Sequence, residues 1–122
     1  IDSVLRISQI AVPHLEKTKG AIVNVSSIAK SALDQITVQM AGSLAKKGIR
    51  VNSVKHRQGM KKLVLSSSPP YRRASHVLAG YKCCVCKVVF QIILFLADRS
   101  QSEILVGHIV TADGGLTLKG VL

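Results

Sequence analysis

The amino-terminal third of the chain carries a helical hydrophobic pattern followed by a strand-like one. Apolar residues recur at helical spacing between positions 4 and 15, and the Lys-Thr-Lys-Gly segment at 17–20 is typical of a helix end. Residues 21–26 are apolar and mostly β-branched, which predicts a buried parallel strand. The same order then repeats as a helix at 29–44 and a strand at 49–54. The predicted apolar face of this second helix consists of Ala32, Leu33, Ile36, Met40 and Leu44.

The carboxyl-terminal segment repeats the helix-then-strand order. Residues 92–97 form an apolar helical stretch, and 106–112 predict a third strand that ends at Asp113 and two glycines. Strands that are separated by helices of this length indicate a parallel sheet joined by right-handed crossovers. The predicted fold class is therefore α/β, with three parallel strands and their helices.

The composition is that of a folded chain with a positive charge. The 122 residues are 48% hydrophobic, and the mean hydropathy is +0.34. These values argue against a disordered chain and fit one domain in size. The formal net charge of +11 suggests a polyanionic partner, but aromatic residues are only 3% of the chain, so side chains for base stacking are scarce.

The positive charge is concentrated in the middle of the chain. Residues 55–90 contain eight of the 17 basic residues and none of the six acidic ones, together with all three cysteines. The Ser-Ser-Ser-Pro-Pro run at 66–70 breaks regular structure there. We therefore divide the chain into 1–54, a basic divergent insert at 55–90 that we expect to be disordered, and 91–122.

Targeting signals are lacking in the sequence. The longest apolar run, 88–97, is too short to span a membrane, and no secretory segment or paired cysteine framework is present. We therefore expect a cytoplasmic location. The first residue is Ile1 rather than methionine, from which we expect a processed chain or a piece of a longer one.

Five short motifs, taken in order, carry a family resemblance. They are GAIVNVSS at 20–27, KSALDQ at 30–35, GIRVNSV at 48–54, FLAD at 95–98 and ADGG at 112–115. Together they resemble the carboxyl-terminal half of the short-chain dehydrogenase/reductase (SDR) family, over the chain outside 55–90. The resemblance implies a partial Rossmann-like, doubly wound parallel sheet, of which this chain supplies the last three strands and their helices.

The resemblance implies hydride transfer between NAD or NADP and a small carbonyl or alcohol substrate. In that family a tyrosine is the general acid/base, a lysine four residues later holds the nicotinamide ribose, and a serine orients the carbonyl. Ser27 falls on the catalytic serine, and Lys30 falls on the lysine that serves both catalysis and cofactor binding. The position four residues before Lys30 is Ser26, so the tyrosine and its loop are missing.

Two more parts of the family pattern have no counterpart in this sequence. The glycine-rich phosphate loop and the relay asparagine lie outside the 122 residues, and Lys55-His56 replaces the Pro-Gly turn that follows the second strand. We therefore expect a fragment that is inactive as written. In the family, the helix matching 29–44 and the strand matching 106–112 often lie at subunit interfaces, which implies a homo-oligomer or a full-length paralogue as partner.

Other interpretations stay open. One alternative is a non-catalytic interaction module that pairs with a full-length relative. Another is a basic nucleic-acid-binding protein, against which the lack of any recognised nucleic-acid motif argues. A further hypothesis is that 55–90 is translated non-coding sequence, because the family pattern stops at Val54 and resumes near Gln91. A transcript that spans both junctions in frame would contradict it.

Two local motifs compete with the family interpretation and are weaker. Ser27-Ile28-Ala29-Lys30 has the S-x-x-K spacing of penicillin-binding proteins, but no Lys-Thr-Gly follows it. The segment 83–86 contains one C-x-x-C pair, whereas structural zinc sites use four ligands, commonly as two spaced pairs. We therefore predict no metal site.

Overall fold

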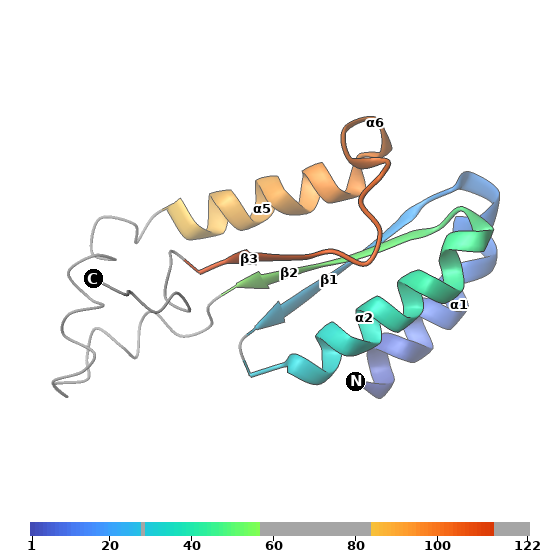
Figure 1. The fold of residues 1–122 in the computed structure, drawn as a ribbon, viewed down its shortest axis with the longest axis horizontal. Coiled ribbons are helices and arrows are strands. Elements are labelled where there is room, and N and C mark those ends of the chain that lie inside the picture. Colours follow the sequence, from blue (N-terminus) through green and yellow to red (C-terminus); the bar gives the residue numbers. More distant parts are fainter. Residues whose placement is uncertain (28, 57–83, 114–122) are drawn as a thin grey trace, which may run out of the picture.

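A parallel sheet forms the centre of the computed structural model, which describes residues 1–27, 29–56 and 84–113. The strands, in their order across the sheet, are β1 (Ala21–Ser27), β2 (Arg50–His56) and β3 (Ile109–Ala112). The helices are α1 (Asp2–Thr18), α2 (Ser31–Leu44), the 3-10 turn η1 (Ala45–Lys47), α5 (Cys84–Ala97) and α6 (Arg99–Ser102). Helices α1 and α2 cover one face and α5 covers the other (Figure 1). The predicted α/β class with a parallel sheet is confirmed.

Side chains of β2 alternate between the two helical layers, as the pleat of a strand requires. Val51 packs with Ala41 of α2 and with Ile49 in the fully buried core on one face. The preceding residue, Arg50, directs its side chain to α5 on the other face. Because both faces are covered, five consecutive residues of β2 are buried, and the four that follow Arg50 are apolar or small and polar.

The guanidinium of Arg50 fastens α5 to the sheet. Its Nη1 donates to the carbonyl of Leu96 (3.0 Å) and to the carbonyl and Oγ of Ser102 (2.9 and 2.8 Å). Its Nη2 donates to the carbonyl of Ala97 (3.1 Å). Burial lowers the pKa of Arg50 from its ordinary value, and the nearby charge of Arg99 lowers it further. The guanidinium nevertheless remains charged, and it lies at the end of α5, where the helix dipole favours a cation.

Two buried asparagines hold neighbouring segments on the sheet. Asn52 Nδ2 donates to the carbonyl of Leu105 (2.8 Å), and its Oδ1 accepts from the N–H of His108 (2.9 Å). Asn24 Nδ2 donates to Thr37 Oγ1 of α2 (2.9 Å). Each side chain therefore satisfies polar groups that burial would otherwise leave unpaired.

The faces of the two amino-terminal helices differ in part from the prediction. Ile7 and Ile10 of α1 are 66% and 72% exposed, because only the opposite side of α1 contacts α2 and the sheet. In α2 the buried residues are Leu33, Asp34, Thr37 and Ala41. Ala32 is exposed, and Ile36, Met40 and Leu44 are half-buried beside α1. The sequence indicated an apolar face on each helix, but not which of its residues would contact the sheet and which would contact the neighbouring helix.

Three element ends also differ from the prediction. Strand β2 continues to His56, and α5 begins at Cys84, so both ends of the predicted insert belong to regular elements. Strand β3 begins at Ile109 rather than 106, since Gly107 has a positive φ of 74° that interrupts extended backbone. The rest of the predicted insert, 57–83, lies outside the described residues.

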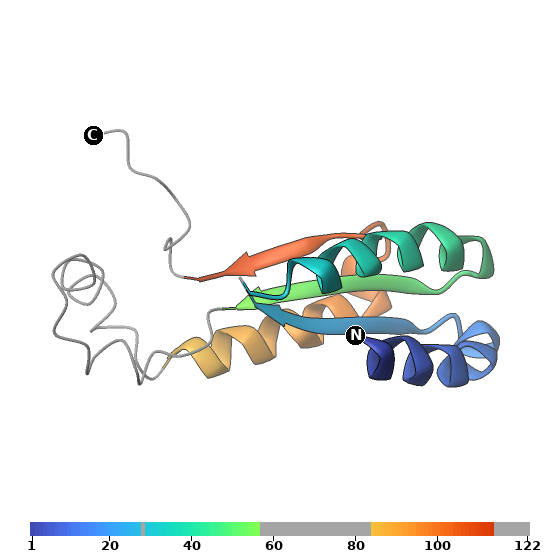
Figure 2. The same cartoon turned by 90° about the horizontal axis from the view of Figure 1, so that it is seen from below.

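The two crossovers have opposite hands. The β1–α2–β2 unit is right-handed, as predicted (Figure 2). Strand β3 takes the next place in the same direction, yet α5 lies on the opposite face from α2, so the second crossover is left-handed and that part of the prediction is wrong. The segment 57–83 separates β2 from α5, so the chain is long enough to reach the far face. Among the described helices, none is both long and apolar enough to cross a bilayer.

Replacing Arg50 should loosen α5. We expect Arg50→Ala to lower the free energy of unfolding by about 3 kcal/mol, because several buried acceptors lose their donor. Urea denaturation followed by circular dichroism measures the effect. Arg99→Ala is the matched control: its side chain is 43% exposed, so the expected loss is below about 1 kcal/mol. Equal urea midpoints for the two variants would contradict the role of Arg50.

Asp98, the N-cap residue of α6, should make the free energy of unfolding depend on pH in the acidic range. Asp98 accepts hydrogen bonds from the Oγ and N–H of Ser100 (2.7 and 2.9 Å), and these hold its pKa below the ordinary 3.8. A lowered folded pKa stabilises the fold above the ordinary value, and this stabilisation disappears as the pH falls through the folded pKa. The urea midpoint of the unsubstituted chain should therefore fall more between about pH 5 and about pH 2 than that of Asp98→Asn. Parallel pH profiles for both chains would exclude this contribution.

Candidate functional site

The carboxyl ends of the strands meet at one edge of the sheet, where open α/β sheets bind ligands. All three arrowheads in Figure 1 point to this edge, and α2 begins there. Ser27 ends β1, and Lys30 is the residue before α2. His56 ends β2 and pairs in register with Ser27. The structure thus places both candidate catalytic residues at the edge that their proposed roles require.

Ser27 and Lys30 are joined through the backbone rather than through their side chains. The N–H of Lys30 donates to the carbonyl of Ser27 (2.9 Å), which closes a tight turn between β1 and α2. Ser27 is 3% exposed, and its Oγ has no hydrogen-bond partner among the described residues. Lys30 is exposed, and no hydrogen bond of its amine occurs within the described ranges. The amine of Lys30 is therefore exposed at this edge, whereas the hydroxyl of Ser27 is buried and unpaired there.

The position expected for the catalytic tyrosine does not lie on a helix. Ser26, four residues before Lys30, belongs to β1 and is 1% exposed. Its Oγ is 3.4 Å from the carbonyl of Lys30, to which it donates a weak hydrogen bond. Position 26 therefore lies on a strand, and not on a helical face where residues four positions apart are neighbours. That the general acid/base is missing from this motif stays a prediction from the sequence.

A buried ion pair lies between α2 and the end of β2, and the sequence analysis missed it. Lys55 Nζ is 2.8 Å from Asp34 Oδ2, and the two side chains are 22% and 6% exposed. Asp34 Oδ1 has no partner within the described part of the chain. The pair ties the first turn of α2 to β2, where the family pattern has a Pro-Gly turn. Asp34 is outside the predicted apolar face of this helix and Lys55 is inside the predicted insert, so no local pattern pointed to the pair.

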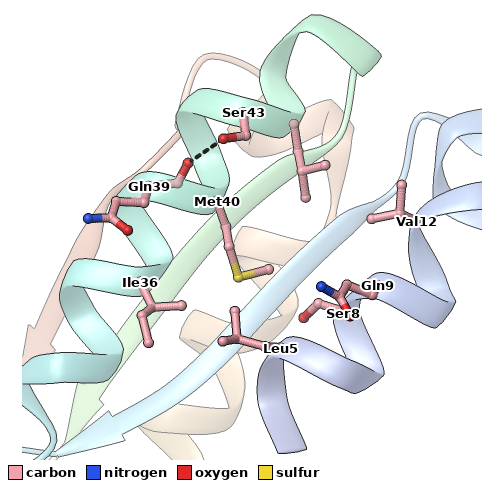
Figure 3. Close-up of a pocket in the computed structure, with 9 residues that line it drawn as sticks. Leu5, Ser8, Gln9, Val12, Ile36, Gln39, Met40 and Ser43 are labelled. Carbon is pink, nitrogen blue, oxygen red and sulfur yellow. Dashed lines mark hydrogen bonds between the residues drawn. The ribbon is translucent and has the colours of Figure 1, made fainter. Parts of the chain in front are cut away.

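Two other groups of residues do not form a site. No group of three or more His, Cys, Asp or Glu side chains within 1–27, 29–56 and 84–113 is arranged to hold a metal ion. Cys83, the first residue of the C-x-x-C pair, lies outside these residues. A cavity of about 340 Å³ opens between α1 and α2, where Leu5, Ile36 and Met40 point toward one another (Figure 3). Its lining is mostly apolar and includes neither candidate catalytic residue, so this cavity is separate from the candidate site.

Comparison with known proteins gives a family match along nearly the whole chain. A family model described as Enoyl-(Acyl carrier protein) reductase matches residues 1–117. The chain belongs to the short-chain dehydrogenase/reductase family. Two solved SDR structures from Caenorhabditis elegans share its fold: the apo-form of a glucose dehydrogenase (33% identity, TM-score 0.71) and a family member of unknown function with cofactor (34%, 0.75). This chain is covered to 98% and 99%, whereas those chains are covered to 55% and 54%.

The curated relatives are also about twice as long as this SDR chain. It is 29% identical to the 7alpha-hydroxysteroid dehydrogenase of Paraclostridium sordellii over 136 residues, which are 97% of this chain and 51% of that protein. A meso-2,3-butanediol dehydrogenase from Serratia marcescens is 40% identical over 68 residues, 44% of this chain and 27% of that protein. The first match, at 136 residues, is longer than the 122-residue chain. That relative therefore has residues inside the matched region that this chain lacks.

A double-mutant cycle tests the buried ion pair. Asp34→Asn and Lys55→Met, each made alone, should lower the free energy of unfolding, because each leaves a largely buried group without its partner. The expected coupling energy between the two changes is about 1–3 kcal/mol, measured by urea denaturation. The exposed pair of Glu16 and Lys47 (3.2 Å, both 45% exposed) is the control, with coupling below about 1 kcal/mol. Equal coupling energies in both cycles would show that burial does not strengthen the ion pair of Asp34 and Lys55.

Proposed function

We propose that this chain supplies the carboxyl-terminal half of an NAD(P)-dependent oxidoreductase that acts on a small carbonyl or alcohol substrate. We also propose that the 122 residues alone do not catalyse hydride transfer. The observation that carries the first proposal is the turn between β1 and α2, which presents Ser27 and Lys30 at the carboxyl edge of the sheet. The whole enzyme's activity needs residues beyond this half, because the solved relatives are matched over little more than half of their length.

The two side chains fit the nicotinamide end of the cofactor in this proposal. The exposed amine of Lys30 would bind the nicotinamide ribose, and the unpartnered hydroxyl of Ser27 would donate a hydrogen bond to the substrate carbonyl. The cofactor, when bound, supplies or accepts the hydride. One solved relative was determined with a cofactor, which supports NAD(P) use in the family without deciding between NAD and NADP.

The missing general acid/base supports the proposal of inactivity. Proton transfer by a positioned side chain contributes about 10²–10⁴-fold to an enzymatic rate. Neither tyrosine of the chain replaces the missing one, because Ser75 follows Tyr71 by four residues and Val85 follows Tyr81 by four. The chain also lacks the glycine-rich loop that would hold the pyrophosphate at a helix N-terminus. Both the proton transfer and the cofactor affinity should therefore be lost.

A non-catalytic interaction module is the second candidate. Apolar side chains on α5 support it: Phe90 and Leu94, one helical turn apart, are 60% and 52% exposed. Such surface is typical of a face that another chain or domain covers. A homo-oligomer or a full-length paralogue would provide that cover. The cytoplasmic location stays a prediction, and so does the expectation that nucleic acid is not a partner.

An activity assay on the purified chain tests the main proposal. Incubation with NADH or NADPH and a panel of small ketones and aldehydes should show no oxidation above the buffer rate. Ser27→Ala and Lys30→Met are the matched variants, and a full-length SDR is the positive control. Carbonyl-dependent oxidation by the unsubstituted chain that either variant abolishes would overturn the proposal of inactivity. It would also identify these two side chains as catalytic.

A further inference from the structure

We propose that the outward side of α5 binds the surface of an anionic lipid bilayer, with the helix lying in the plane of the headgroups. This role goes beyond the proposed function and does not depend on it. Three observations carry it: the apolar side chains that α5 exposes, the positive charge of the chain around this helix, and the length of the helix. The outward side of α5 consists of the exposed residues Lys87, Val88, Phe90, Gln91, Leu94 and Phe95.

Helix α5 is apolar on nearly all sides, but only one side is covered. Leu96 is fully buried. On the outward side, Phe90 and Leu94 lie one turn apart and are 60% and 52% exposed, and Val88 and Phe95 are 43% and 39% exposed. A helix that is apolar on all sides is normally covered by protein or by lipid. The outward side of α5 is therefore a candidate surface for one of these two.

The polar residues of the outward side are one cation and one amide. Lys87 lies three positions before Phe90, and Gln91 lies three positions before Leu94, so each shares a helical face with an exposed apolar side chain. The sequence of α5 contains no acidic residue. Lysine beside phenylalanine and leucine is typical of helices that lie in the interface of anionic membranes, because the lysine stem reaches the headgroups while the apolar side chains insert. The residue types of this side therefore favour lipid.

The chain that leads into α5 adds positive charge next to this surface. The sequence contains no acidic residue between Asp34 and Asp98, and positions 57–83 contain six Lys and Arg residues. These positions lie outside the described residues, but their charge belongs to the same polypeptide that enters α5. Polybasic segments are attracted to anionic leaflets over about a Debye length. Charge complementarity therefore favours an anionic surface as the occupant.

The dimensions of α5 fit a position along the bilayer surface. Its 14 residues span about 21 Å, which is shorter than the roughly 30 Å hydrocarbon core. The helix runs along the sheet, as Figure 2 shows, so its outward side is presented along its length. The acidic side chains beyond its carboxyl end already have partners: Glu103 pairs with Arg99 (3.2 Å), and Asp98 accepts hydrogen bonds from Ser100. A side-on contact therefore leaves the anchor at that end of α5 in place.

A second copy of this chain fits the same surface less well. Each copy has a formal net charge of +11, and the outward side of α5 offers no acidic residue to face Lys87 of another copy. Facing like charges oppose association. The opposite layer differs in this respect: α1 exposes Ile10 but contains Asp2 and Glu16. The exposed apolar residues of α1 therefore provide a control for those of α5.

A tryptophan introduced on α5 tests the contact directly, because the chain contains no tryptophan of its own. We expect the fluorescence of Phe90→Trp to shift to shorter wavelength, and to be quenched by brominated acyl chains, with vesicles of phosphatidylcholine and phosphatidylserine at about three to one. Ile10→Trp is the matched control on the opposite layer, where Ile10 is 72% exposed, and it should stay unquenched. Vesicle binding without quenching of Phe90→Trp, or with equal quenching of both probes, would overturn the proposal.

Vesicle flotation measures how much the apolar side chains and the charge contribute. The unsubstituted chain should bind the phosphatidylserine vesicles about tenfold or more tightly than pure phosphatidylcholine, and added salt should reduce this preference. Leu94→Glu should weaken binding about tenfold or more, whereas Ile10→Glu should leave it unchanged. Both positions are exposed, and circular dichroism verifies that the variants fold. Equal affinity of the two variants would contradict a contact through α5.

Sedimentation velocity without lipid identifies a protein partner of the same surface. A dimer that Leu94→Glu dissociates, together with no vesicle binding, would assign the outward side of α5 to a contact between copies and overturn the proposal. A monomer that binds the phosphatidylserine vesicles supports it. None of these measurements involves turnover. Carbonyl reduction by the chain would therefore overturn the proposed inactivity without affecting the lipid contact, and absent vesicle binding would overturn only the lipid contact.

Discussion

The α5 side of the structure depends on one buried guanidinium. Arg50 reaches from β2 to the last carbonyls of α5 and to Ser102, so a single side chain joins a strand to two helices. An unpaired buried cation would be costly, but here the helix end and four acceptors hold it. Asn52 lies on the same face of β2 as Arg50. Its side chain binds the carbonyl of Leu105 and the N–H of His108, and these bonds hold the loop that leads from α6 into β3. The third strand lies beside β2 through these polar contacts.

The carboxyl edge of the sheet holds the two residues that fall on the SDR motif, Ser27 and Lys30. Ser27 and Lys30 remain within one tight turn, but the residue at the tyrosine position has become part of a buried strand. On the neighbouring strand, Lys55 forms an ion pair with Asp34 and joins β2 to α2 at the place where the family pattern has a Pro-Gly turn. The edge is thus closer to a structural junction than to a complete active site.

Much of the fold and of the candidate site was predictable from short-range pattern. Strand β1, the parallel sheet and the positions of Ser27 and Lys30 follow from β-branched runs, helix ends and motif order, since each is encoded within a few residues. The exposed Ile7 and Ile10, the early start of α5 and the left-handed second crossover were not predictable. They depend on which neighbour covers which face, and periodicity contains no information about that. The pair of Asp34 and Lys55 was missed for the same reason, since its members lie 21 residues apart.

Local residue pattern alone was enough to establish the class of fold, the family and the loss of the tyrosine, because each is a property of neighbouring residues. The tertiary structure alone decided that Arg50 is an internal anchor rather than a surface charge, and that α5 keeps an exposed apolar side. It also decided that half of the buried positions of α2 are polar. These features arise where segments distant in sequence meet. Burial, charge pairing and strand direction are set there by the partner segment and not by the residue itself.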